Sequence, residues 1–454
     1  MKRLLLPGFA VLLNGCSSLT LSEYQRPVLS YPPAWQQHTS GTAYLRDSGQ
    51  WWRQFNDPML SSNIERALIS NNDLILAGMR LKQALLDVKL SNGTLTPDVS
   101  ASGSASNAKS LKTGDPSSER YSASLSLSYE LDLWGKLAST RSQAQWSANA
   151  TAQDLQNTAR LLIGSVAGLH WRLAQYNQKI RQLQEIQRLN EQVLKLTGSQ
   201  YQAGKVGQED VLQAEQTIVN QRLQLASLQT EREKARHALA ILLDLPAGTA
   251  VPESTTTKEV SPLTISLSQP LAIIARRPDV QAAEWRLRAA LAGSDVARLN
   301  FYPTLSLQAV LDTGASVFSQ WFSAPSRTLG TQLGLPFLQW NTVQATVGRS
   351  ALDVQQAAIT FRSSVNSALS EVADANVERE SLWKQYQTLQ RNQSIDTRRS
   401  AIARSKYQAG EQSLTYLLNA MAQEFNNEIN LTQAGYQYLN ATLTLCLAMG
   451  YGNT

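Results

Sequence analysis

A shift of 206 residues superimposes the second half of this 454-residue chain on its first half. The landmarks that keep this spacing are Asp73 with Asp279, Arg80 with Arg286, Trp134 with Trp340, and Tyr201–Gly204 with Tyr407–Gly410. A duplication at fixed spacing predicts two structural repeats built on one plan. We assign them to residues 57–250 and 271–454, with a linker over 251–270.

Each half is dominated by long polar segments with apolar residues at helical spacing. Residues 137–200 contain no proline, and at roughly 1.5 Å per residue they would form a helix about 96 Å long. The other predicted helices cover about 208–244, 343–405 and 413–448, with shorter ones over about 57–93 and 271–299. Helices this long cannot surround one compact core, so they must pair side by side.

A second kind of segment alternates strictly. From Tyr121 to Leu131, odd positions are apolar and even positions are Ser or Glu, which is typical of a strand with one apolar and one polar face. Strands are predicted over about 97–107, 120–131, 303–313 and 328–338. A soluble β-sandwich with one wet face is the alternative, but four short strands among so many helical residues fit it poorly.

These strands have the length that crosses a bilayer at a tilt. No apolar run approaches the roughly 18 residues of a membrane-spanning helix, so any crossing would have to use strands. Four strands cannot close a membrane barrel, which needs at least about eight. The predicted fold class is therefore mainly α with membrane β, in which several chains share one barrel.

The N-terminus predicts export. Residues 1–15 combine Lys2 and Arg3 with an apolar run, as in a secretory signal peptide. The Gly15-Cys16 step resembles the bacterial lipobox, which implies cleavage before Cys16 and its lipidation. Ser17, in place of a retaining aspartate, implies delivery to the outer membrane. A plain signal peptide with an incidental cysteine is the alternative. We expect residues 16–56 to form an extended linker after the signal peptide.

Five motifs in order resemble the TolC-type outer-membrane factors, in the lipidated branch typified by OprM and CusC of resistance-nodulation-division pumps. They are Tyr24–Pro27, Trp51–Pro58, Tyr129–Lys136, Arg276–Asp279 and Ala368–Ala375. The resemblance implies a homotrimer with a twelve-stranded barrel continuous with a helical periplasmic tunnel. It also implies a passive efflux exit channel whose partners are a periplasmic adaptor, an inner-membrane transporter and outer-membrane lipid.

The two Tyr-x-x-Gly turns, where each long helix pair reverses, are expected at the periplasmic tip. For Gly204, Gly207 and Gly410 we expect a tight turn with adaptor docking through exposed backbone. The resemblance further implies a periplasmic gate at Asp210 and Tyr407.

The same resemblance gives the neighbouring gate and aperture positions. Gln412 stands where relatives have an arginine, which predicts a more weakly held gate unless Arg404 substitutes. Tyr416 and Asn419 would line the aperture, and since neither is charged, strong cation binding there is not expected. Glu209 would leave the tip acidic.

Catalysis is not expected. His38, His170 and His237 lie on different segments without metal-ligand spacing, and we expect the latter two to be packed or solvated. No phosphate-binding loop, nucleophile elbow or zinc-protease motif occurs, so neither a cofactor nor a metal is predicted, apart from the lipid on Cys16. No basic run suggests nucleic acid.

Two other functions stay open. A trimeric adhesin or structural coiled-coil lipoprotein would also be exported and helical, although adhesins carry their barrel segment at one end. A type I protein-secretion duct would share the channel plan. The transported substrate, whether drug, metal ion or another molecule, is not encoded in any recognisable motif.

Overall fold

The computed structural model describes residues 22–28, 49–111, 116–256 and 270–451. The predicted signal peptide, Cys16, His38 and most of the linker over 251–270 lie outside these ranges. The chain forms two compact units, and each draws segments from both sequence halves. The 206-residue repeats and the compact units are thus two different divisions of the chain.

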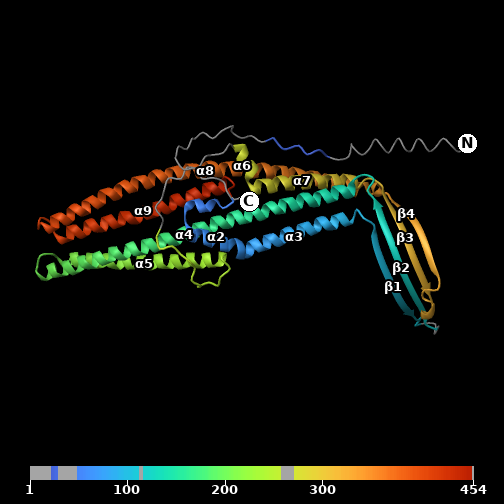
Figure 1. The fold of residues 1–454 in the computed structure, drawn as a ribbon, viewed down its shortest axis with the longest axis horizontal. Coiled ribbons are helices and arrows are strands. Elements are labelled where there is room, and N and C mark those ends of the chain that lie inside the picture. The colour runs from blue at the N-terminus through green and yellow to red at the C-terminus, as the bar shows by residue number, and fades with distance from the viewer. Residues whose placement is uncertain (1–21, 29–48, 112–115, 257–269, 452–454) are drawn as a thin grey trace. The chain divides into compact units, whose positions relative to one another are not determined.

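The first unit contains one antiparallel sheet with the strand order β1-β2-β3-β4 (Figure 1). The strands are β1 (Asp98–Ala108), β2 (Ser118–Leu131), β3 (Thr304–Ala315) and β4 (Pro325–Gly334). β2 pairs with β3 from Tyr121 opposite Ala315 to Leu131 opposite Leu305. The central pairing therefore joins the two sequence halves, and β1 and β4 are left as the outer edges.

The predicted alternation separates two faces of this sheet. On one face, serine hydroxyls pair across β1 and β2, with oxygen–oxygen distances of 2.7, 2.9 and 2.8 Å for Ser100–Ser126, Ser102–Ser124 and Ser104–Ser122. The other face carries the apolar residues, which stay in register across all four strands. The period-2 pattern thus marks a real two-faced sheet.

The fourth strand was predicted wrongly at its end. It stops at Gly334 rather than continuing to 338, and Pro336–Gln339 form a 3₁₀ turn instead. Pro336 cannot donate to a sheet ladder, and its fixed φ suits the first position of a helical turn.

Each of the two shorter predicted helices is broken in two. The first splits into α2 (Pro58–Ser70) and α3 (Asn72–Gly93) at Asn71, whose backbone is extended and whose amide oxygen caps α3 by accepting from the Leu74 N–H at 3.1 Å. The second splits into α6 (Pro270–Arg276) and α7 (Pro278–Leu299). There Pro278 disfavours the helical conformation of the residue before it.

Four long helices complete the fold: α4 (Lys136–Gln202), α5 (Gln208–Leu242), α8 (Trp340–Gln408) and α9 (Leu414–Ala448). They match the predicted segments to within three residues at each end. Among the described residues, no helix is both long and apolar enough to cross a membrane.

The second unit has the main hydrophobic core. Its centre is the 3₁₀ helix Trp51–Phe55, whose Trp51 is fully buried and meets Tyr451 edge-on at 6.2 Å between ring centroids. The C-terminal half of α9 is its most continuously buried element and includes the free cysteine Cys446. Burial of a whole helix requires apolar residues on most of its sides, and α9 is the most apolar of the four long helices.

Candidate functional site

The α4–α5 and α8–α9 turns have the same backbone geometry. Gly204 and Gly410 have φ of 68° and 76°, which favours glycine. The next residue donates its N–H five residues back, Lys205 to the Gln200 carbonyl and Glu411 to the Lys406 carbonyl, both at 2.9 Å. This is the Schellman arrangement that satisfies the last carbonyls of a helix. The 206-residue duplication therefore extends to individual hydrogen bonds.

The helices that follow these turns begin differently. At α5, the Asp210 carboxylate accepts the Gly207 N–H at 3.0 Å. At α9, the equivalent of Gly207 is Ser413, whose hydroxyl oxygen accepts the Tyr416 N–H at 3.1 Å. Asp210 therefore has a capping role of its own, next to its predicted role in the gate.

A polar groove beside the α4–α5 turn brings two predicted site residues together. It encloses about 420 Å³ between α4, α5 and α9, and both Asp210 and Asn419 line it. The other lining residues are Asn190, Val193, Thr197, Gln200, Val206, Gln213, Ala214, Thr217 and Thr415. Amide and hydroxyl side chains dominate this lining, so the groove suits a polar rather than an apolar occupant.

The other predicted gate and aperture residues point outward. Tyr407 is 40% exposed and Tyr416 46% exposed. The side chains of Arg404, Gln412 and Glu209 are also exposed. Within the described part of the chain, none of these five side chains has a hydrogen-bond or ion-pair partner. Partners for a gate would therefore have to come from another molecule.

Sequence reasoning missed a polar ladder between α4 and α9. Its four contacts are Arg172 Nε to the Tyr436 hydroxyl at 3.2 Å, Gln175 Nε2 and Lys179 Nζ to Gln433 Oε1 at 2.5 and 2.6 Å, and Gln182 Nε2 to Thr432 Oγ1 at 3.1 Å. Burial lowers the pKa of Lys179. The hydrogen bond that Arg172 donates to the Tyr436 hydroxyl raises the pKa of Arg172. The spacing Gln175, Lys179, Gln182 is the only sequence signal for this buried polar stripe.

Arg277, part of a motif quoted above for the family resemblance, is buried at the end of α9. Its Nη1 donates to Glu371 Oε2 at 2.7 Å and to the Ala448 carbonyl at 3.1 Å. The equivalent residue of the first repeat, Asn71, donates to the Leu242 carbonyl at 3.2 Å. Since Ala448 and Leu242 are also 206 residues apart, the same helix end is held in both repeats by different side chains.

His170 is a packed histidine, one of the two environments expected for it. It is 1% exposed, with Nε2 at 3.0 Å from Asp57 Oδ2 and Nδ1 at 3.4 Å from the Asn63 amide nitrogen. Asp57 also caps α2 by accepting the Leu60 N–H. His237 is exposed. Among the described residues, no three His, Cys, Asp or Glu side chains are placed to hold a metal ion.

Aromatic rings bracket the apolar face of the sheet in the first unit. Near the start of β3, Trp134 packs on Tyr302 and Phe301 on Trp340, at 5.1 and 5.4 Å between centroids. A second aromatic group lies at the hairpin ends of the strands, where its rings contact one another. It consists of Tyr121, Phe318, Trp321 and Phe322.

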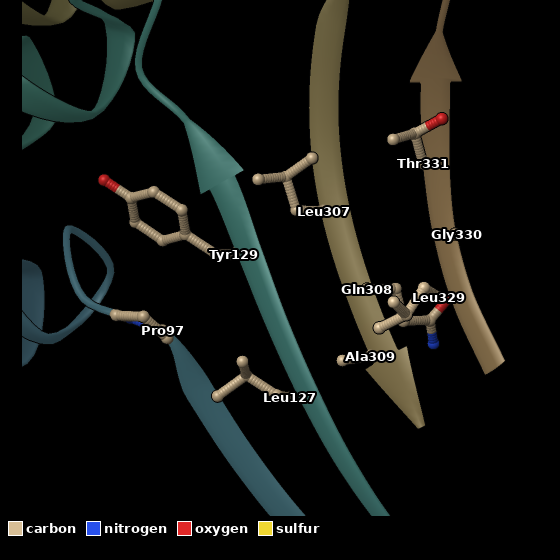
Figure 2. A pocket seen from close by; sticks show the side chains of 9 residues that line it. All are labelled: Pro97, Leu127, Tyr129, Leu307, Gln308, Ala309, Leu329, Gly330 and Thr331. Atoms are coloured by element: carbon tan, nitrogen blue, oxygen red, sulfur yellow. The ribbon is translucent and has the colours of Figure 1, made fainter. Parts of the chain in front are cut away.

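Between these aromatic groups lies a shallow apolar cavity of about 490 Å³. Figure 2 shows Tyr129 and Leu307 projecting from adjacent strands to the same side. Leu127, Ala309 and Leu329 add aliphatic lining. Leu307 and Leu329 remain 42% and 69% exposed. Such an apolar surface on a sheet requires a non-aqueous environment or a partner.

Known proteins are similar to this chain along almost its whole length. The chain is 28% identical to toxin and drug export protein A of Aggregatibacter actinomycetemcomitans, over 95% of this chain and 94% of that protein. It is 28% identical to the pyoverdine export outer membrane protein OpmQ of Pseudomonas aeruginosa, over 100% and 97%. It is 27% identical to the cation efflux system protein CusC of Escherichia coli K12, over 98% of each chain.

Solved channels share the fold. A crystal structure of CusC superimposes with a TM-score of 0.80 at 25% identity, covering 95% of this chain and 99% of that one. The CmeC outer-membrane channel of Campylobacter jejuni gives 0.83 at 24% identity, covering 96% and 95%. The predicted fold class, helical with a small set of strands, is confirmed by these neighbours.

The outer membrane efflux protein family model matches residues 63–244 and again 270–451. The two matches are offset by about the duplication spacing, so each repeat is one copy of the family's unit. The match covers most of the chain, and the chain therefore belongs to the outer membrane efflux protein family.

Proposed function

We propose that three copies of this chain form one passive efflux channel in the outer membrane and complete its barrel together. Family membership shows an outer-membrane efflux channel, which supports a transport role over that of an adhesin or an enzyme. The observation that supports the trimer is the four-stranded sheet with an apolar face and two open edges, β1 and β4. An open edge in lipid leaves backbone groups unsatisfied, and pairing β4 with β1 of the next copy removes both edges.

The dimensions of the sheet support a membrane location. From Tyr121 to Leu131 the apolar face runs over eleven residues, and the ten steps between them span about 33 Å along the strand at roughly 3.3 Å per residue. At the usual tilt of roughly 40° this corresponds to about 25 Å, the height of the apolar band of a membrane barrel. The aromatic groups at both ends fit the interfacial girdles of such barrels.

Two measurements test the assembly. The mass of the purified protein in detergent should be that of three chains, and the protein should form discrete pores in planar bilayers. Deletion of residues 305–338, which removes most of β3 and all of β4, should abolish both. A stable single chain, or a trimer without pores, would contradict the proposal.

We further propose that the exposed gate residues close the channel by contacts between copies. The support is that the side chains of Tyr407 and Arg404 have no partner within the described part of the chain, while Asp210 and the predicted aperture residue Asn419 line one polar groove. Because Gln412 is neutral, this gate should be weakly held. A periplasmic adaptor and an inner-membrane transporter would open it, as is expected for exporters of this kind.

The gate test must separate the charge of Asp210 from its capping role. Asp210→Asn keeps an oxygen for the Gly207 N–H and removes the charge, whereas Asp210→Ala removes both. Both variants, and Tyr407→Phe, should raise single-channel conductance and antibiotic leakage into cells. Glu209→Gln, the adjacent acid without a capping contact, is the control and should have a smaller effect. Conductance unchanged in Asp210→Asn but raised in Asp210→Ala would assign Asp210 to the helix cap alone.

A further inference from the structure

Arg327 stands on the apolar face of the sheet. It lies directly opposite Leu311 on β3, and Leu311 in turn lies opposite Leu125 on β2. The row ends at Ala101 on β1. Directly opposed residues share a face, so this guanidinium interrupts a row that is otherwise aliphatic.

The described part of the chain offers Arg327 no counter-ion. The acid nearest in the sheet, Asp312, is opposite Ser326 and Ser124, which places it on the serine face. A neighbouring copy at the β4 edge would not supply one either. On the apolar face, β1 carries only Val99, Ala101, Gly103 and Ala105 through the row of Tyr121. Among the described residues, no carboxylate on the apolar face lies beside the row of Arg327.

The loop between β3 and β4 folds onto the same face, near its hairpin end. A Cβ placed on Gly103 would lie 3.9 Å from the Trp321 ring, so the absence of a side chain there leaves room for the indole. Thr313 Oγ1 donates to the Trp321 carbonyl at 2.8 Å and fixes the loop. Phe322 joins Leu125 in lining a second apolar cavity of about 420 Å³.

This loop also contains an unsatisfied donor. The indole Nε1 of Trp321 is buried and has no hydrogen-bond partner within the described residues. Phe318 and Phe322 beside it are 65% and 72% exposed. Exposed aromatic rings of this kind are typical of side chains at a lipid headgroup boundary.

The spacing fits a headgroup contact. Arg327 lies two rows, about 13 Å along the strands, below the row of Tyr121. With the strands tilted, the vertical depth is smaller, and a long arginine side chain extends toward the interface while its stem stays in the apolar layer. A planar guanidinium can donate two parallel hydrogen bonds to a phosphate.

We propose that Arg327 and the aromatic loop Phe318–Phe322 bind the phosphate headgroup of a lipid in the leaflet at the hairpin end of the sheet. The inference rests on the proposed function, because it takes the apolar face to be in lipid. Arg327 supplies the charge, and the exposed rings of Phe318 and Phe322 pack against the upper acyl chains. The site would hold each channel at a fixed depth.

Native mass spectrometry of the detergent-solubilised protein with added lipid tests this site. Wild type should retain phosphatidylglycerol about tenfold better than phosphatidylcholine, because the choline cation already neutralises the phosphate of the latter. Arg327→Gln should remove that preference, and Arg327→Lys should keep part of it. Phe322→Ala should weaken retention of both lipids, because it removes an exposed ring. The matched control is Arg120→Gln, which removes a guanidinium from the serine face of β2, opposite Ser106, and should retain the wild-type preference.

Three outcomes would overturn the proposal. One is Arg327→Gln with the wild-type preference, and another is Arg120→Gln with an equal loss. The third is dissociation of Arg327→Gln into single chains before lipid is added, which would make Arg327 a contact between copies. Pore conductance is recorded in parallel. Normal pores without a lipid preference would contradict only the lipid site, whereas the lack of any pore would contradict the proposed channel.

Discussion

Single buried polar residues hold the ends of the helices in this protein. Arg277 and Asn71 occupy equivalent positions and donate to equivalent carbonyls, but only Arg277 also reaches a carboxylate. A buried carbonyl left without a donor costs about 1–3 kcal/mol, whereas the carboxylate of Glu371 is 55% exposed and its attraction is screened by water. The carbonyl of Ala448 should therefore matter more to stability than Glu371.

Arg277→Met tests this ordering. It should lower the free energy of unfolding by about 1–3 kcal/mol, because it leaves the Ala448 carbonyl unsatisfied. Glu371→Gln keeps the arginine in place and removes an acid that is 55% exposed, so it should cost less than about 1 kcal/mol. Urea unfolding followed by circular dichroism measures both. Equal losses would show that the ion pair, not the helix-end contact, carries the stability.

Lys179 makes a prediction about pH. Burial lowers its pKa in the folded protein, so between that lowered value and the ordinary lysine pKa the folded state holds fewer protons than the unfolded state. The free energy of unfolding must therefore rise with pH across this alkaline window. The melting temperature of wild type, minus that of Lys179→Met, should increase between pH 8 and about pH 10.

The control for this measurement is Lys234, an exposed lysine whose pKa is raised by a hydrogen bond to Glu231. A lysine whose pKa is raised by folding stabilises the folded state at every pH below the ordinary lysine pKa. This stabilisation is lost only as the pH rises above that value. The difference between wild type and Lys234→Met should therefore stay flat over the same window. A flat profile for Lys179→Met as well would show that Lys179 is solvated in solution.

At the scale of elements, much of the architecture was predictable from local pattern. Period-2 alternation located the strands, and long polar segments without proline located α4 and α8, since both signals lie within the segment itself. The sequence prediction missed the helix breaks at Asn71 and Arg277 and the early end of β4. Hydrophobic periodicity is judged over a window of many residues, so a break made by a single residue does not show in it.

The functional region was less predictable than the fold. The turns at Gly204 and Gly410 were found from glycine placement. The ladder between α4 and α9 was not, because Gln182 and Thr432 are 250 residues apart. Which polar face meets which partner depends on tertiary packing, and a single sequence does not encode it locally. The predicted roles of the gate residues stay predictions.

The turns can be tested against a helical glycine. Gly410→Ala places a side chain at φ 76° and should destabilise the α8–α9 turn by about 1 kcal/mol. Gly348→Ala, at an exposed position within α8 where a Cβ meets nothing within 4 Å, should instead stabilise its helix by roughly 0.5–1 kcal/mol. Hydrogen-exchange mass spectrometry of peptides covering each site reports the local change. Equal protection in Gly410→Ala and wild type would mean that the turn adopts another conformation in solution.

At the scale of the whole molecule, the N-terminal segment is held on α7. The Ser22 N–H and hydroxyl donate to the two carboxylate oxygens of Asp295 at 3.0 and 2.6 Å, and Arg26 pairs with Glu284 at 2.9 Å. Cys16 precedes Ser22 by six positions, which limits the distance between them to about 20 Å. A lipid on Cys16 would therefore attach close to this contact.

Cys16→Ser tests the proposed anchor. The variant should be exported but should wash from outer-membrane fractions more readily than wild type, because the acyl chains no longer contribute to membrane binding. Labelling of growing cells with radioactive palmitate should mark wild type and not the variant. Ser18→Ala is the matched control and should keep the label. Wild type without label would refute the anchor.

The pairing of β2 with β3 limits how early during synthesis the sheet can be completed. Leu131 meets Leu305, so the first hairpin must wait for 174 further residues before its neighbour exists. At roughly 5–20 residues per second of synthesis, that interval is about 10–35 s. During this interval β2 lacks a partner strand on one edge, and an apolar hairpin with an open edge is prone to pair with other chains until β3 has been made.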